Sequence, residues 1–122
     1  DAAMPFVTEA NANRQRIYVL GYSIGGNDAR DLAVKCKAAN IPIDGLFLVE
    51  PGSFGFFTGK IPDNVRKVVF YMSGDCSLPQ AVGDYPDDPR KTRVKLETLS
   101  GYHHLELPAH VAGYIRNEIR GP

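Results

Sequence analysis

The side chains best suited to covalent chemistry lie at four separated points of the sequence. They are the serine of Gly-Tyr-Ser-Ile-Gly-Gly, Ser23, two carboxylates, Glu50 and Asp75, and an adjacent pair of imidazoles, His103 and His104. A serine hydroxyl is a weak nucleophile until an imidazole removes its proton, and the imidazole needs a carboxylate to hold its tautomer. These residue types therefore predict nucleophilic attack on an acyl carbonyl, provided that the fold brings the side chains together.

Each of these residues follows a hydrophobic run that is typical of a β-strand. Strands are expected at 16–20, 43–49, 67–72 and 93–99, and amphipathic helices at 2–13, at 27–39 and from Pro108 to Gly121. The run at 16–20 predicts a fully buried strand. Strands alternating with helices predict a three-layer α/β fold with a mostly parallel sheet of about four strands. Because the carboxyl ends of parallel strands meet at one edge, we expect the candidate side chains to converge there.

The turn at 21–26 matches G-x-S-x-G between a strand and a helix. A serine in such a tight, strained turn leaves little room for neighbouring side chains, so glycine is expected at Gly21 and Gly25. The turn leads into a helix N-terminus, where the Ile24 amide is the best candidate donor to a developing oxyanion. A phosphate-binding turn is the weaker interpretation, because the Lys and Ser/Thr of a phosphate-binding loop are absent.

The segment RIYVLGYSIGGNDARDLAVKCKAANIPIDGLFLVEP and the tail LSGYHHLELPAHVAGYIRNEI resemble the C-terminal half of the α/β-hydrolase superfamily. The first is similar to the strand, nucleophile turn, helix and next strand of esterases, lipases and thioesterases, and the tail to their histidine loop and last helix. This resemblance covers nearly the whole chain, in the order serine, acid, histidine. It implies a serine hydrolase that cleaves a carboxylic ester or thioester through an acyl-enzyme, with no cofactor.

The resemblance also suggests which acid and which histidine act with Ser23. Residues 74–79, GDCSLP, are similar to the acid loop of the family, which favours Asp75. Glu50 is the alternative, at the position where some lipases and thioesterases carry an Asp. The run GYHHLEL is similar to a lipase G-Y-x-H-L-D pattern and favours His104 as the base, whereas counting from Gly101 favours His103.

An apolar substrate pocket is expected from side chains in the loops around the serine. The candidates are Tyr22, Phe54, Phe56, Phe57 and Leu78, with core packing as the equal alternative for the phenylalanines. No metal site is expected: the spacing of His103, His104, Glu106 and His110 lacks the helical histidine pair of zinc motifs.

Composition excludes several other classes of function. With 14 basic and 14 acidic residues the net charge is zero, which removes any broad attraction to nucleic acid or anionic membrane. No apolar stretch is long enough to span a bilayer. Cys36 and Cys76 are expected at different edges of the sheet, too far apart for a disulfide. Free thiols slightly favour a cytoplasmic location.

Residues 1–122 are expected to form one partial α/β-hydrolase-like domain. The chain begins Asp1-Ala2-Ala3, and the strands that precede the nucleophile turn in full α/β-hydrolases are not in it. The first strand would then lie at a bare sheet edge, which favours pairing with another chain. A second chain or a homo-oligomer is therefore expected to complete the sheet. A non-catalytic binding or assembly module built on the hydrolase scaffold is the alternative function.

Overall fold

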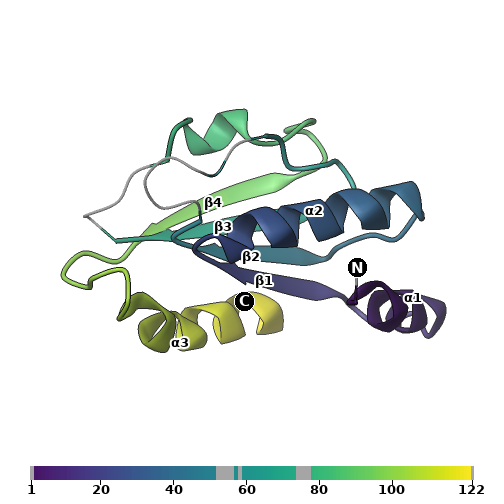
Figure 1. Ribbon diagram of the computed structural model, residues 1–122, viewed down its shortest axis with the longest axis horizontal. Coiled ribbons are helices and arrows are strands. Elements are labelled where there is room, and N and C mark those ends of the chain that lie inside the picture. The colour runs from purple at the N-terminus through teal and green to yellow at the C-terminus, as the bar shows by residue number, and fades with distance from the viewer. Residues whose placement is uncertain (1, 52–56, 58, 74–77, 122) are drawn as a thin grey trace.

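The computed structural model describes residues 2–51, 57, 59–73 and 78–121. Strands and helices alternate along the chain (Figure 1). In order, the elements are α1 (Met4–Ala12), β1 (Tyr18–Tyr22), α2 (Gly25–Ala38), β2 (Gly45–Val49), β3 (Lys67–Met72), the short 3₁₀ helix η2 (Val82–Asp84), β4 (Arg93–Thr98) and α3 (Leu107–Arg120). The chain therefore has an α/β fold, as the alternation in the sequence predicted.

The four strands form one parallel sheet in the order β1-β2-β3-β4. Their carboxyl ends lie within one residue of each other: Tyr22 pairs with Val49 and Val49 with Tyr71, and β3 and β4 continue for one more pair, Met72 with Thr98. Because neighbouring strands are parallel, each connection must return from the carboxyl end of one strand to the amino end of the next. All the segments that follow a strand consequently start from the same end of the sheet.

Helices cover both faces of the sheet, and the sheet separates the core into two clusters, one on each face (Figure 1). Along β2, Leu46 and Leu48 belong to the cluster that includes the buried face of α2, whereas Phe47 and Val49 belong to the cluster under α3. Successive side chains of a strand point to opposite faces, so an unbroken apolar run is what a strand covered on both faces needs. β2 is buried over its whole length, and β3 is buried from Val68 to Met72.

The two edge strands differ from each other and from the centre of the sheet. The expectation of a fully buried first strand is wrong: β1 is an edge strand, most of it is half-buried, and Leu20 is 60% exposed. Its composition suits a buried strand, but neighbours cover an edge strand less completely. β4, the other edge, alternates charged side chains at Arg93, Lys95 and Glu97, a common protection of sheet edges. β1 carries no charged residue.

None of the helices in the described part of the chain is long and apolar enough to cross a membrane.

Candidate active site

Main-chain hydrogen bonds bring the residues that follow β1 and β2 to one end of the sheet. The Ser23 amide donates to the Val49 carbonyl at 2.9 Å, and the Glu50 amide donates to the Tyr71 carbonyl at 2.9 Å. Each residue thus continues the ladder one step beyond its strand. The side chains of Ser23 and Glu50 consequently start from neighbouring positions, although 26 residues, which include α2 and β2, lie between them in the sequence.

The turn at Ser23 has an unusual backbone conformation, and the chain passes close to its neighbours at two glycines of the turn. Ser23 has φ +56°, in the left-handed region that costs a non-glycine residue of order 1–3 kcal/mol. A Cβ on Gly21 would lie 2.7 Å from the Gly25 carbonyl oxygen, and one on Gly26 would lie 2.6 Å from the Cβ of Pro51. A Cβ on Gly25 would meet no described atom within 4 Å. The spatial need for glycine therefore falls at Gly21 and Gly26, and the expectation for Gly25 is wrong.

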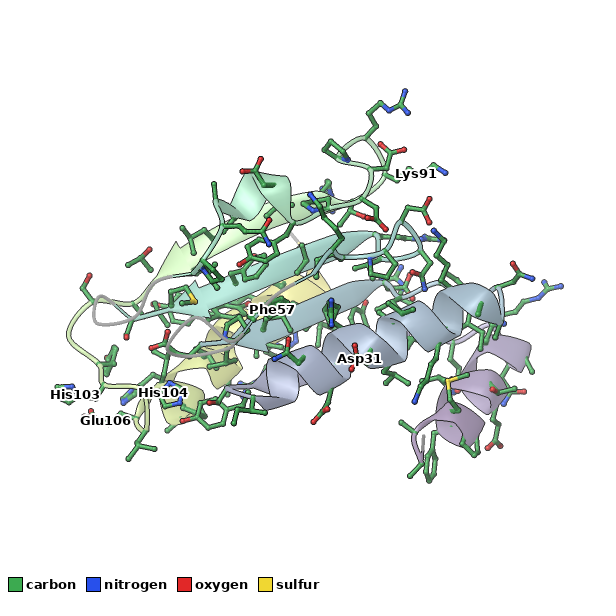
Figure 2. All side chains as sticks on the ribbon, turned by 45° about the horizontal axis from the view of Figure 1, so that its top comes forward. Asp31, Phe57, Lys91, His103, His104 and Glu106 are labelled. Atoms are coloured by element: carbon green, nitrogen blue, oxygen red, sulfur yellow. The ribbon has the colours of Figure 1, made fainter. Side chains whose placement is uncertain are left out.

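His104 lies within hydrogen-bond distance of the serine. Its Nε2 is 3.1 Å from Ser23 Oγ, and its side chain is 25% exposed. The adjacent His103 is exposed, and its carbonyl accepts from the amides of Glu106 and Leu107 where the chain enters α3. Both histidines lie at the carboxyl end of the strands (Figure 2). Of the two, it is His104 that contacts Ser23.

The second nitrogen of His104 faces a buried carboxylate. His104 Nδ1 is 3.9 Å from Glu50 Oε1, an ion-pair distance longer than a hydrogen bond. Glu50 is fully buried and has φ +46°. Its Oε1 accepts a hydrogen bond of 2.5 Å from the Ser73 hydroxyl, which is also buried. Burying a carboxylate costs free energy unless it is hydrogen-bonded, so the hydrogen bond from Ser73 helps to stabilise Glu50 in its buried position.

Tyr22 contacts both the main chain and the ring of His104. Its hydroxyl donates to the His104 main-chain carbonyl at 2.8 Å, and the two rings stack with centroids 5.0 Å apart at 21°. Burial, and after it the charge of Glu50, raises the pKa of the Tyr22 phenol above its usual value of 10.0. The phenol therefore stays protonated, and able to donate, throughout the neutral range.

Several other predicted residues lie elsewhere or outside the described residues. Asp75, Phe54 and Phe56 are among those outside, as is Cys76. Leu78 is half-buried and packs against the core cluster that includes the buried face of α2. Phe57 is fully buried in that cluster, with its ring edge-on to Phe70 and Tyr85, so core packing is the correct alternative for this residue.

The remaining histidine and the described cysteine make other contacts. The ring of His110, on α3, stacks on Tyr102 with centroids 3.8 Å apart. Cys36 is a free, buried thiol on α2, and burial raises its pKa. Over residues 2–51, 57, 59–73 and 78–121, no group of three or more His, Cys, Asp or Glu side chains is arranged to hold a metal ion.

The sequence analysis missed Ser73. The signal was present, because Ser73 directly follows β3 just as Ser23 follows β1 and Glu50 follows β2. Each of the three residues is the first beyond its strand, and β3 ends one residue further along the sheet than β2, so the Ser73 hydroxyl is within reach of Glu50.

Comparison with known proteins adds no relative to this description: no family model, no curated protein and no solved structure matches the chain.

Proposed function

We propose that the protein is a serine hydrolase that cleaves a carboxylic ester or thioester. The observation that carries the proposal is the line of three side chains in which Ser23 Oγ lies 3.1 Å from His104 Nε2 and His104 Nδ1 faces the buried Glu50 at 3.9 Å. A catalytic serine, histidine and acid are recognised by the contacts between them, serine to histidine and histidine to acid, and not by their spacing along the chain. The left-handed conformation at Ser23 adds support, because strain of this kind concentrates at functional sites.

The proposed reaction follows from these contacts. His104 Nε2 takes the hydroxyl proton as Ser23 Oγ bonds to the substrate carbonyl carbon. It then gives that proton to the alcohol or thiol, which leaves as its bond to the acyl group breaks. In the second half of the reaction His104 takes a proton from water as the water oxygen bonds to the acyl carbon. The acyl–Oγ bond then breaks, His104 returns the proton to Ser23 Oγ, and the carboxylic acid departs. No cofactor takes part in this scheme.

The charge that develops on the carbonyl oxygen needs donors beside the serine. Ile24 precedes α2, and the first amides of a helix have no acceptor within the helix. The Ile24 amide is the proposed donor, since it directly follows the nucleophile and benefits from the positive end of the α2 dipole.

Glu50 is the proposed acid of the site. A carboxylate that orients an imidazole must face the nitrogen that does not contact the serine, as Glu50 Oε1 does. The distance is long for a hydrogen bond, and catalytic contacts of this kind commonly shorten when substrate binds. Asp75 is the alternative acid, and a pair of variants described in the Discussion separates the two.

The direct test is labelling with a fluorophosphonate, which forms an Oγ–phosphorus bond and releases fluoride. Wild-type protein is expected to be labelled at Ser23, with the site located by mass spectrometry of peptides. Ser23→Ala should abolish labelling, whereas Ser100→Ala, at an exposed serine of the loop before α3, should leave it unchanged. An unlabelled wild type, or equal labelling of Ser23→Ala, contradicts the proposal.

The open edge of β1 favours a second function, assembly with another chain. Within the described residues nothing pairs with the outer side of this strand, which is uncharged and exposes Leu20. An edge of this kind is a ready template for a further strand. Under this proposal the hydrolase scaffold serves mainly for binding, and Ser23→Ala leaves the assembly intact.

A further inference from the structure

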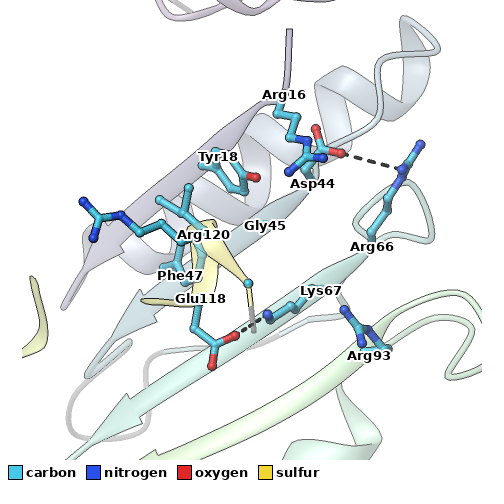
Figure 3. Close-up of a pocket in the computed structure, with 12 residues that line it drawn as sticks. Arg16, Tyr18, Asp44, Gly45, Phe47, Arg66, Lys67, Arg93, Glu118 and Arg120 are labelled. Atoms are coloured by element: carbon cyan, nitrogen blue, oxygen red, sulfur yellow. Dashed lines mark ion pairs between the residues drawn. The ribbon is translucent and has the colours of Figure 1, made fainter. Parts of the chain in front are cut away.

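A cavity of about 280 Å³ lies at the end of the sheet opposite to Ser23, where the strands begin (Figure 3). Five cationic side chains from different parts of the chain line it. They are Arg16 before β1, Arg66 and Lys67 at the start of β3, Arg93 at the start of β4, and Arg120 at the end of α3. We call this cavity the basic pocket.

Two carboxylates also line the basic pocket and neutralise part of its charge. Asp44 lies 3.7 Å from Arg66, and Glu118 pairs with Lys67, as the dashed lines in Figure 3 mark. The lining therefore carries five positive and two negative groups, 5 − 2 = +3. The carbonyl end of α3 also reaches the cavity and offsets about half a unit charge, leaving a surplus of about +2.5.

Three arginines account for this surplus. Arg16, Arg93 and Arg120 form no ion pair within the described part of the chain, whereas the other two cations of the pocket do. They come from three elements that are distant in sequence, and the fold gathers them around one opening. Because the whole chain has zero net charge, this concentration is local and is not a consequence of a basic composition.

We propose that the basic pocket binds the diphosphate group of a small molecule. Guanidinium groups present planar sets of donors that match phosphate oxygens. Several guanidinium groups can all find an acceptor on a diphosphate, which has many oxygens, whereas a single carboxylate has only two. The surplus of about +2.5 is close to the charge of a diphosphate at neutral pH, so charge complementarity selects this ligand over monovalent anions. The pocket lies away from Ser23, so this binding is independent of the proposed hydrolase activity.

The test is calorimetric titration of the full chain with inorganic pyrophosphate. Saturable binding of one pyrophosphate per chain is expected, with orthophosphate about tenfold weaker. Removing one charge-assisted contact costs about 1.5–3 kcal/mol, so Arg16→Gln, Arg93→Gln and Arg120→Gln should each weaken binding at least about tenfold.

Controls separate the pocket from general charge effects and from loss of folding. Arg14→Gln and Arg116→Gln change exposed arginines outside the pocket and should leave the affinity unchanged. Arg93→Lys keeps the charge and should retain most of the binding if the variant is folded, as its thermal melting will show. Absence of binding, equal weakening by the control variants, or equal affinity for citrate overturns the proposal.

Discussion

The hydroxyl of Tyr22 donates a hydrogen bond to the main-chain carbonyl of His104, 82 residues further along the chain, and its ring stacks on the imidazole of the same residue. Tyr22 directly precedes Ser23, so one residue of the turn at Ser23 contacts both the backbone and the ring of His104. The contact fixes the histidine relative to the serine from one side, while Glu50 faces it from the other.

This relationship predicts a graded loss of activity at Tyr22. Tyr22→Phe removes a hydrogen bond worth about 1 kcal/mol and should lower kcat about fivefold. Tyr22→Leu also removes the stacked ring and should lower kcat about thirtyfold. KM should stay unchanged in both, measured with a chromogenic ester, and Tyr114→Phe at an exposed tyrosine of α3 is the control. A rise in KM instead would favour the expected place of Tyr22 in the substrate pocket over a role in positioning His104.

Glu50 and Asp75 are separated by matched amide substitutions. Glu50→Gln removes the carboxylate charge behind His104 with little change in shape, and should slow fluorophosphonate labelling by about a thousandfold or more. Asp75→Asn is expected to change the rate by less than about threefold. The reverse result, in which Asp75→Asn is the slow variant, would move the acid to the segment after β3.

The close approach of Pro51 to α2 predicts different outcomes at two adjacent glycines. Gly26→Ala forces a Cβ to within 2.6 Å of Pro51 and should lower the free energy of unfolding by about 1–3 kcal/mol. Gly25→Ala has space for the added methyl group, and alanine is the better helix former, so this variant should unfold at equal or higher denaturant concentration. Urea unfolding followed by circular dichroism measures both, and equal destabilisation would contradict the contact.

Glu118 predicts a stability difference that depends on pH. Burial alone would raise the pKa of its carboxyl, but the ammonium groups of Lys67 and Lys95 outweigh burial and lower it below the usual 4.5. A lowered folded-state pKa stabilises the fold above the unfolded-state pKa, and this contribution is lost as the pH falls through the folded-state value.

Glu118→Gln should therefore unfold about 1 kcal/mol more easily than wild type at pH 7, with the difference vanishing at acidic pH. Thermal melting across the range from pH 7 to pH 3 checks this expectation. Asp31→Asn, at an exposed carboxylate paired with Arg30 on α2, is the control and should show little difference at either pH. A difference for Glu118→Gln that stays constant with pH would assign its effect to packing.

The two edges of the sheet predict different behaviour when a charge is added. Leu20→Lys places a charge on the uncharged edge strand β1 and should reduce association with other chains, measured by light scattering over a range of concentrations. Leu96→Lys adds a charge to β4, which already carries three, and should have little effect. Similar effects of the two variants would argue against assembly through β1.

The order of the elements and the convergence of strand ends were predictable because they follow from local patterns. The apolar runs at β2 and β3 are continuous, as strands covered on both faces require. The exposure of Leu20 was not predictable, because it depends on which strand lies at the edge and not on the composition of β1. Gly25 and Gly26 illustrate the same limit, since Pro51, distant in sequence, decides which of them needs to be glycine.

In the candidate site, too, some features were predictable from the sequence and others were not. Ser23 was identifiable from its turn, but choosing between His103 and His104 depended on which adjacent side chain turns toward the serine. That direction is set by the loop between β4 and α3 and by the ring of Tyr22, neither of which has a sequence signature. The contact between Ser73 and Glu50 depends on the register of β2 against β3, which is fixed only when the strands pair.

The sequential order of the sheet also has a consequence for synthesis on the ribosome. Each strand pairs with the one made just before it, so β1, β2 and β3 are able to assemble while the rest of the chain is still being translated. Ser23, Glu50 and Ser73 would then be in place before His104 exists. If the proposed function holds, a nascent chain would carry the nucleophile without its base, and it would remain chemically inert until the segment between β4 and α3 emerges.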